Sequence, residues 1–246
     1  MSWLASLSRS RPALLEVGEA YARWAPTYPR EAANELMRLD ERSVLRLLPD
    51  VRGLRVLDVG CGAGRYLGLL AARGASRVIG IDPEPAMLAR AGAPVVCAGL
   101  PRLPIAPAAF DLVVCALVVG HLPDLPGALA ELGRVLRPGG TLLLLEIGRP
   151  SGRVHHRLAA WYLGQAVPLL CRIFMPRTPS ATLMRYFWDT IEHCVEPRVI
   201  LDQLAASGFV EVGCETDMDL FRAYHARTPV QVSAAPRWNV LRSPRS

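Results

Sequence analysis

Apolar residues gather in short blocks along the middle of the chain, and segments with helical spacing separate the blocks. Short apolar runs that stop at glycine or at Asp-Pro are typical of strands buried on both faces of a sheet. These runs predict strands at residues 54–59, 78–81, 94–97, 111–119 and 141–147. Helices are predicted at residues 66–73, 85–91 and 126–136, the last closed by the Arg-Pro-Gly-Gly breaker at 137–140. Strands that alternate with helices specify a parallel sheet with right-handed crossovers, so the predicted fold class is α/β.

The pattern changes after residue 150. Residues 153–193 are rich in aromatics and predicted to be helical, and a helix at 198–207 precedes strands at 209–214 and 219–225. The last helix and strands can complete the sheet. The 153–193 segment is therefore predicted to be an insertion that lies over one end of the sheet. We expect one domain over residues 1–228, divided into N-terminal lid helices (12–50), a core (51–150), a helical cap (151–195) and C-terminal elements (196–228), followed by a disordered tail (229–246).

Composition narrows the function classes. The chain has 246 residues, of which 51% are hydrophobic and 20% charged, so it can build a substantial core. All 28 basic residues are arginine, which excludes a Schiff-base lysine and a P-loop lysine. The net charge of +6 is spread along the chain instead of forming one basic face, so nucleic acid is not an expected partner.

The six cysteines predict neither a metal site nor a redox motif, because no two of them lie closer than 18 residues apart. They are expected to be buried free thiols in a reducing compartment. The first residues do not resemble a signal peptide, and the longest uncharged helical segment is too short to span a bilayer. We therefore predict a cytoplasmic protein that can touch a membrane without crossing it.

The candidate chemistry lies where the first two strands end. Gly60, Gly62 and Gly64 follow the first strand and precede a helix, where backbone can approach a ligand closely. Asp82 ends the second strand, where its carboxylate can accept both hydroxyls of an adenosine ribose. A dinucleotide fingerprint would need its third glycine at the position of Arg65, so the turn favours a ligand without a pyrophosphate.

Four segments, taken in order, resemble the successive motifs of class I S-adenosylmethionine-dependent methyltransferases. They are V-L-D-V-G-C-G-A-G (56–64), I-G-I-D-P (79–83), F-D-L-V-V-C (110–115) and V-L-R-P-G-G-T-L-L (135–143). The resemblance implies a Rossmann-like seven-stranded sheet with a reversed last strand, helices on both faces, and S-adenosyl-L-methionine as cofactor. The candidate cofactor-binding residues are Asp58, Gly60, Cys61, Gly62, Gly64, Asp82, Pro83, Met87, Gly99, Leu100 and Ala116.

The chain departs from the family at the adenine. The family often has an acidic residue soon after the third strand, and Gly99 stands there in this sequence. We therefore expect backbone groups and apolar contacts from Pro83, Met87 and Leu100 to hold the ring.

The C-terminal half resembles the ubiquinone/menaquinone C-methyltransferases, through E-I-G-R-P (146–150), V-P-L-L (167–170) and L-x-x-S-G-F-V-E-V (204–212). The matching positions of that family's Arg-Asn pair are Gly120 and His121 here. Residues 21–29 resemble the lid helix of a broader group of small-molecule methyltransferases. The candidate substrate-binding residues are Tyr21, Trp24, Tyr28, Trp161, Tyr162 and Tyr186.

His121 is the candidate catalytic residue. It follows the fourth strand, where a neutral imidazole can take a phenolic or hydroxyl proton, or can shape the pocket without doing so. The other histidines are expected to be solvated or structural. Asp124 and Glu146 can act as bases, and capping is the preferred interpretation for both.

The apolar residues between 158 and 170 occupy both sides of the predicted helix, so it needs cover on both sides. That cover can come from the sheet, from an apolar substrate, from a second subunit, from a membrane, or from ordinary burial in a helical cap.

These features predict methyl transfer to a carbon or oxygen of an apolar, aromatic or prenylated small molecule. A polar or acyl-carrier-linked O-methyltransferase and a non-catalytic cofactor-binding subunit stay open as alternatives. Base methylation of DNA is disfavoured, because residues 115–118 (Cys-Ala-Leu-Val) replace the element that grips an amino group.

Overall fold

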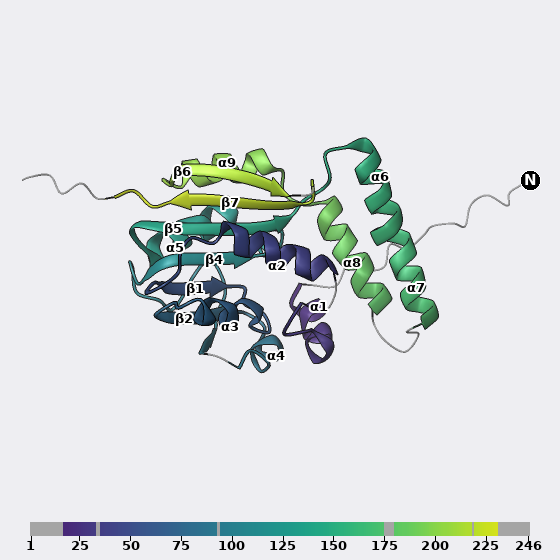
Figure 1. Cartoon of the computed structure of the whole chain (residues 1–246), viewed down its shortest axis with the longest axis horizontal. Helices are drawn as coiled ribbons and strands as arrows, with labels where there is room; N and C mark the ends of the chain where they lie inside the picture. The colour runs from purple at the N-terminus through teal and green to yellow at the C-terminus, as the bar shows by residue number, and fades with distance from the viewer. Residues whose placement is uncertain (1–16, 33–34, 93, 175–179, 218, 231–246) are drawn as a thin grey trace, which may run out of the picture.

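The computed structural model describes residues 17–230 except for 33–34, 93, 175–179 and 218. Within this part of the chain, seven strands form one sheet in the order β3-β2-β1-β4-β5-β7-β6 (Figure 1). Strands β1 to β5 are parallel, and β7 runs antiparallel to both of its neighbours. The bounds are Arg55–Val59 (β1), Arg77–Asp82 (β2), Val95–Cys97 (β3), Phe110–Ala116 (β4), Leu136–Ile147 (β5), Val210–Asp217 (β6) and Phe221–Arg227 (β7). The predicted seven-stranded sheet with a reversed last strand is confirmed.

Both faces of the sheet are buried, as alternate residues of β1 show. Leu57 and Val56 are fully buried, but they belong to different hydrophobic clusters. The cluster of Leu57 includes α5 and α9, and that of Val56 includes α2 and α3. These helices are α2 (Glu35–Leu47), α3 (Arg65–Ala72), α5 (Leu125–Val135) and α9 (Pro197–Ala206). Burial on both faces is the reason that the strands read as continuous apolar runs in the sequence.

The strand order reverses direction between β1 and β4, which opens a crevice at the carboxyl ends of these strands. Short elements surround this edge. The 3-10 turn η2 (Val119–His121) follows β4 and α4 (Pro85–Leu88) follows β2, while α1 (Val17–Trp24) and η1 (Ala25–Thr27) pack against α4. The carboxyl edge of the sheet is therefore the place to look for a ligand site.

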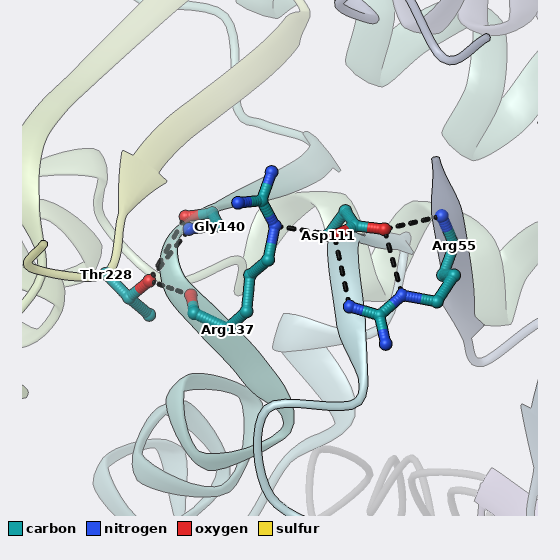
Figure 2. Close-up of polar contacts among 5 residues, drawn as sticks. All are labelled: Arg55, Asp111, Arg137, Gly140 and Thr228. Atoms are coloured by element: carbon teal, nitrogen blue, oxygen red, sulfur yellow. Dashed lines mark hydrogen bonds and ion pairs between the residues drawn. The ribbon is translucent and has the colours of Figure 1, made fainter. Parts of the chain in front are cut away.

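The Arg-Pro-Gly-Gly segment does more than end α5. β5 begins already at Leu136, and the ladder with β4 shifts register before Thr141, so residues 137–140 form a bulge. Thr228 closes this bulge: its hydroxyl accepts the N–H of Gly140 at 3.0 Å and donates to the carbonyl of Arg137 at 2.6 Å (Figure 2). The sequence pattern alone predicted a break in place of this strand.

Asp111 joins the same bulge to β1 at the amino ends of the strands. Its carboxylate accepts the backbone N–H of Arg55 at 2.7 Å and the Nε of Arg55 at 3.1 Å, and it pairs with Arg137 (Figure 2). The hydrogen bonds from Arg55 hold the pKa of Asp111 below its usual value. This cluster ties three strands together at the edge opposite the crevice.

The predicted helical insertion consists of consecutive helices. They are α6 (Arg153–Trp161), the π-helical turn η3 (Tyr162–Ala166), α7 (Val167–Phe174) and α8 (Ser180–Glu192). α7 packs against α8, and α8 places Ile191 in a cluster with Ile147 and Phe221. Among the described residues, no helix combines the length and the apolar character that a membrane span requires.

Several predicted bounds were wrong. The strand predicted to reach residue 119 ends at Ala116, because Leu117 has a positive φ of 60° and the chain turns into η2. The helix predicted at 85–91 ends at Leu88, and the strand predicted to end at residue 214 continues to Asp217. The predicted tail after residue 230 lies outside the described residues, and the predicted domain limits stay predictions.

Candidate functional site

A cavity of about 380 Å³ lies at the carboxyl ends of β1, β2, β3 and β4, beneath α1. Twelve of the residues that the sequence predicts as site residues line it: Tyr21, Tyr28, Gly60, Cys61, Gly62, Asp82, Pro83, Met87, Gly99, Leu100, Ala116 and His121. The lining also includes residues that the sequence analysis did not predict to bind a ligand: Gly18, Val59, Arg65, Tyr66, Glu84, Ala98, Leu117, Val118, Leu122 and Pro123. The cavity joins segments from most of the first half of the chain.

The glycine turn after β1 forms one wall of the cavity. Gly60 and Gly64 have φ values of 74° and 82°, which residues with a Cβ rarely adopt. A Cβ at Gly60 would lie 2.2 Å from Cγ2 of Val118, so a side chain there would collide with the loop after β4. The N–H groups of Gly60 and Cys61 both donate to the carbonyl of Ile81, which fixes the turn against β2.

Asp82 lies at the centre of the hydrogen bonding. Its Oδ2 accepts the N–H of Gly62 at 2.9 Å, and its Oδ1 accepts the N–H of Glu84 at 2.9 Å. Burial raises the pKa of Asp82 above its usual value, while the two N–H groups act in the opposite direction. Each carboxylate oxygen keeps acceptor capacity, because a carboxylate oxygen can accept more than one hydrogen bond. The side chain can therefore receive two vicinal hydroxyls from a ligand in the cavity.

Asp58 lies beneath the glycine turn and does not line the cavity. It is 1% exposed, and its Oδ2 has no hydrogen-bond partner within the described part of the chain. Burial, with the nearby charge of Asp82 as a second cause, raises the pKa of Asp58 to about 7. A buried carboxylate oxygen without a partner fits a ligand that brings a cationic or hydrogen-bonding group to this turn.

The wall nearest β3 is apolar. A Cβ at Gly99 would lie 3.3 Å from the Cβ of Pro83, so the backbone after β3 closely approaches that ring. Met87 is 2% exposed, and Leu100 packs at the edge of the main core. These contacts fit a flat apolar ring. Glu84 also lines the cavity, next to Pro83 of this apolar wall, and the sequence analysis did not identify it. The signal available in the sequence was its position two residues after Asp82.

Aromatic rings and His121 form a second wall, in which Tyr21 and Tyr28 pack against the cluster that contains Met87. The ring of His121 meets Tyr21 edge to face at 5.9 Å, and Trp24 contacts both Tyr21 and Tyr28 without lining the cavity. Burial lowers the pKa of His121 below its ordinary value of 6.5, so the imidazole is neutral at pH 7. A neutral imidazole in this wall can accept a proton from a bound acceptor.

Arg65 brings an unpredicted charge cluster to the cavity. Its Nη2 pairs with Asp40 of α2 and donates to the hydroxyl of Tyr66 at 2.6 Å, and that hydroxyl donates to Asp40 at 2.7 Å. The Arg65 and Asp40 side chains are 10% and 4% exposed. The guanidinium charge is thus compensated within the protein, and the pair links α2 to the glycine turn.

Glu146 supports the loop that carries His121. Its Oε1 accepts the N–H groups of Val118 at 2.9 Å and Val119 at 2.7 Å, so the loop after β4 depends on one side chain of β5. Asp124 accepts the N–H of Gly127 at 2.9 Å and caps α5, which confirms the capping interpretation for that residue.

Replacing Glu146 with alanine is expected to lower the free energy of unfolding by about 2–4 kcal/mol, because two loop N–H groups lose their acceptor. Glu146→Gln keeps an oxygen at this place and should retain most of the stability. Burial raises the pKa of Glu146 to about 7, so the folded protein holds a proton that the unfolded chain has already released. The wild type should therefore lose stability as the pH rises from about 4.5 to about 7, and the glutamine variant should lose less.

Urea unfolding of the wild type and both variants across this pH range measures these differences. Equal stability of Glu146→Ala and Glu146→Gln would contradict the supporting role.

Three further predicted site residues, Gly64, Trp161 and Tyr162, do not line the cavity. Gly64 begins α3, where a Cβ would lie 2.8 Å from the carbonyl of Ala91. Trp161 and Tyr162 are 61% and 55% exposed on the outside of the insertion. The backbone of Tyr186 lies in α8, and its side chain falls outside the described part of the structure.

Comparison with known proteins agrees with this geometry. A family model described as a methyltransferase domain matches residues 57–144. Demethylmenaquinone methyltransferase of Deinococcus radiodurans is 30% identical over 208 residues, which cover 78% of this chain and 84% of that protein. This chain belongs to the class I S-adenosylmethionine-dependent methyltransferase family.

Two further matches agree with this assignment, one in part of the sequence and one in the fold. Malonyl-[acyl-carrier protein] O-methyltransferase of Dechloromonas aromatica is 37% identical over 146 residues, which cover 56% of this chain and 53% of that protein. The chain therefore spans about half the length of this relative. A crystal structure of an S-adenosylmethionine-dependent methyltransferase from Mesorhizobium loti covers 77% of this chain and 97% of its own at 21% identity, with a TM-score of 0.57, which supports the fold.

The family's cofactor is S-adenosylmethionine, and the residues of the cavity fit it. Asp82 presents two oxygens for ribose hydroxyls, the wall of Pro83, Met87 and Leu100 is apolar, and Asp58 has an unpartnered oxygen beneath the turn.

Proposed function

We propose that this chain transfers a methyl group from S-adenosylmethionine to a carbon or oxygen of an apolar acceptor with an aromatic ring, and that a prenylated ring is its substrate class. The observation that carries the proposal is the cavity that the Asp82 carboxylate lines together with Tyr21, Tyr28 and His121. The bound cofactor would supply an electrophilic sulfonium methyl. Transfer breaks the bond from sulfur to methyl, forms a bond from the acceptor atom to methyl, and releases the acceptor's proton to a base.

The residues of the chain bind and orient the two reactants and can accept a proton. The hydrogen bonds of Asp82 and of the glycine turn fix the shape of one end of the cavity. Holding two reactants in the correct orientation can lower much of the activation barrier of a displacement reaction. Tyr21 and Tyr28 supply aromatic surface against which an apolar acceptor can pack. His121 is neutral near pH 7, so it can accept the proton that the acceptor releases.

The charge of the cavity favours an apolar acceptor over a carboxylate. A malonyl thioester presents a carboxylate that needs an unpaired cation, and the arginine of the described cavity wall, Arg65, is already paired with buried Asp40. Similarity to demethylmenaquinone methyltransferase over most of that protein's length also favours an apolar acceptor. Malonyl-[acyl-carrier protein] methylation remains the second candidate, because the identity to that relative is higher over a shorter stretch.

A prenylated acceptor partitions into lipid, so the proposal extends to contact with a membrane surface. A second copy of this chain is the competing partner for the same outer helices.

An acceptor series tests the substrate class. Turnover of S-adenosylmethionine should be measured with a tail-less naphthoquinol, the same ring with one and with several isoprene units, and a malonyl thioester. We expect kcat/KM to rise more than tenfold when two further CH₂ groups are buried, since each contributes ~0.8 kcal/mol.

Leu122→Ala, in the cavity wall, should raise KM for tailed acceptors more than for the tail-less ring, and Val199→Ala on the exposed face of α9 should change neither. Turnover of the malonyl thioester alone would overturn the proposal in favour of the second candidate. No turnover of any acceptor, with cofactor bound, would indicate a non-catalytic subunit.

A further inference from the structure

The outer side of the insertion carries a group of exposed large apolar side chains. Within the consecutive helices α6, η3 and α7, the exposed large side chains recur mostly three and four residues apart, and the π-helical turn lies between the two groups. We call this surface the insertion face. Its residues are Val154, Leu158, Trp161, Tyr162, Leu169, Leu170, Ile173 and Phe174, each exposed by 49% to 76%.

Within the described residues, the contacts of these helices with the rest of the protein lie on their other side. Gly164 lies against Trp188 of α8, where a Cβ would come within 3.1 Å of the indole ring. His156 contacts the same ring at 6.1 Å, and Leu163 packs toward the cluster of Ile191. In Figure 1, α6 and α7 form the outermost edge of the molecule beyond α8. No residue that the structure describes covers the insertion face.

The charge along these helices has one sign. From residue 153 to residue 174 the sequence contains Arg153, Arg157 and Arg172, all exposed, and no Asp or Glu. The neighbouring carboxylates are engaged at the protein side. Asp219 accepts hydrogen bonds from residues 151 and 152 and meets His155, while Glu192 pairs with His156 and, more loosely, with Arg149.

We propose that the insertion face docks on an anionic phospholipid surface. An exposed apolar stripe flanked by arginines matches a bilayer interface, where the apolar side chains enter the boundary of the acyl chains and guanidinium groups meet phosphates. A two-fold dimer through the same face would bring the arginines of both copies together, which like charges disfavour. The partner therefore carries negative charge.

This docking rests on the proposed function, because a prenylated acceptor would reach the cavity from the lipid surface that the insertion face contacts. Leu163 on the protein side of the insertion and Leu117 in the cavity wall pack against one cluster, formed by Ile147, Ile191 and Phe221. Docking thus places the cavity wall one layer of side chains away from the lipid-bound helices. Vesicle binding itself does not require turnover.

Co-sedimentation with lipid vesicles tests the docking. Vesicles of phosphatidylcholine alone and of phosphatidylcholine mixed with phosphatidylglycerol serve as probes. The full chain should bind the mixed vesicles and bind the neutral ones far more weakly. Replacing Arg153, Arg157 and Arg172 together by glutamine should weaken binding to the mixed vesicles on the order of 100-fold, because each arginine near an anionic surface contributes about fivefold.

Control variants separate the insertion face from general effects. Replacing Arg73, Arg77 and Arg102 by glutamine removes the same charge from exposed sites elsewhere and should leave binding unchanged. Leu158→Glu with Ile173→Glu should abolish binding, and Val199→Glu on α9 should not. Equal melting temperatures would establish that all variants fold.

Equal binding of the insertion variants and the wild type, or no preference for the anionic vesicles, would overturn the proposal. Self-association in sedimentation velocity that Leu158→Glu abolishes, without vesicle binding by the wild type, would overturn it and assign the insertion face to a second copy. Failure of the proposed chemistry would appear separately, as vesicle binding by a protein that turns over no acceptor.

Discussion

Replacing Asp82 with alanine is expected to weaken S-adenosylmethionine binding by about 10²-fold or more. The carboxylate presents two oxygens toward the cavity, and a hydrogen bond to a charged group contributes about 1.5–3 kcal/mol. The variant also frees the N–H groups of Gly62 and Glu84, so the turns after β1 and β2 lose their shared acceptor. Both effects lower the affinity for the same ligand.

Isothermal titration calorimetry with S-adenosylmethionine and S-adenosylhomocysteine measures this change. Asp82→Asn keeps one acceptor oxygen and should lie between the wild type and the alanine variant. Asp202→Ala, at an exposed carboxylate on α9, serves as the control and should bind as the wild type does. Because burial raises the pKa of Asp82, wild-type affinity should fall as the medium becomes acidic. Unchanged affinity of folded Asp82→Ala would remove the ribose role from this residue.

The meeting of the glycine turn and Asp82 at one cavity could be predicted, because each residue directly follows or ends a strand that the sequence reveals. Gly60 and Gly62 follow a recognisable buried strand, and Asp82 ends the next one. Parallel strands place their carboxyl ends at one edge, so knowledge of the two strand ends was enough to bring these residues together.

The charge cluster at Arg65 could not be predicted in the same way. Asp40 lies on α2, an element outside the strand pattern, and the two residues meet only when α2 packs over the sheet. The sequence placed Arg65 at a fingerprint position and used it only to disfavour a dinucleotide. Its burial against Asp40 depends on tertiary packing.

The insertion shows a different limit. Trp161 and Tyr162 were predicted to contact substrate because apolar residues occupy both sides of the helix, but periodicity cannot tell which side faces the protein. The structure places Leu163 inward and Trp161 outward. The strand bounds near residues 136–140 were missed for a similar reason, because Thr228, far along the sequence, holds that bulge in the sheet.

Replacing His121 with alanine is expected to lower kcat by about 10²-fold or more, with cofactor affinity nearly unchanged. General-base catalysis by a positioned side chain contributes ~10²–10⁴ in rate, and His121 lines the cavity. The base must be neutral to act. Because burial lowers its pKa, the wild-type rate should rise with pH through a midpoint below 6.5 and stay level above it. Steady-state kinetics across this range, with a phenolic acceptor that is not yet ionised, measures both effects.

His121→Asn keeps a polar side chain of similar size without a titrating group, so it should lose as much activity as alanine and lose the pH dependence. If His121 instead only shapes the cavity, asparagine should restore most of the rate and the pH profile should not depend on residue 121. That result, together with a nearly active alanine variant, would assign proton removal to solvent or to an acceptor already ionised.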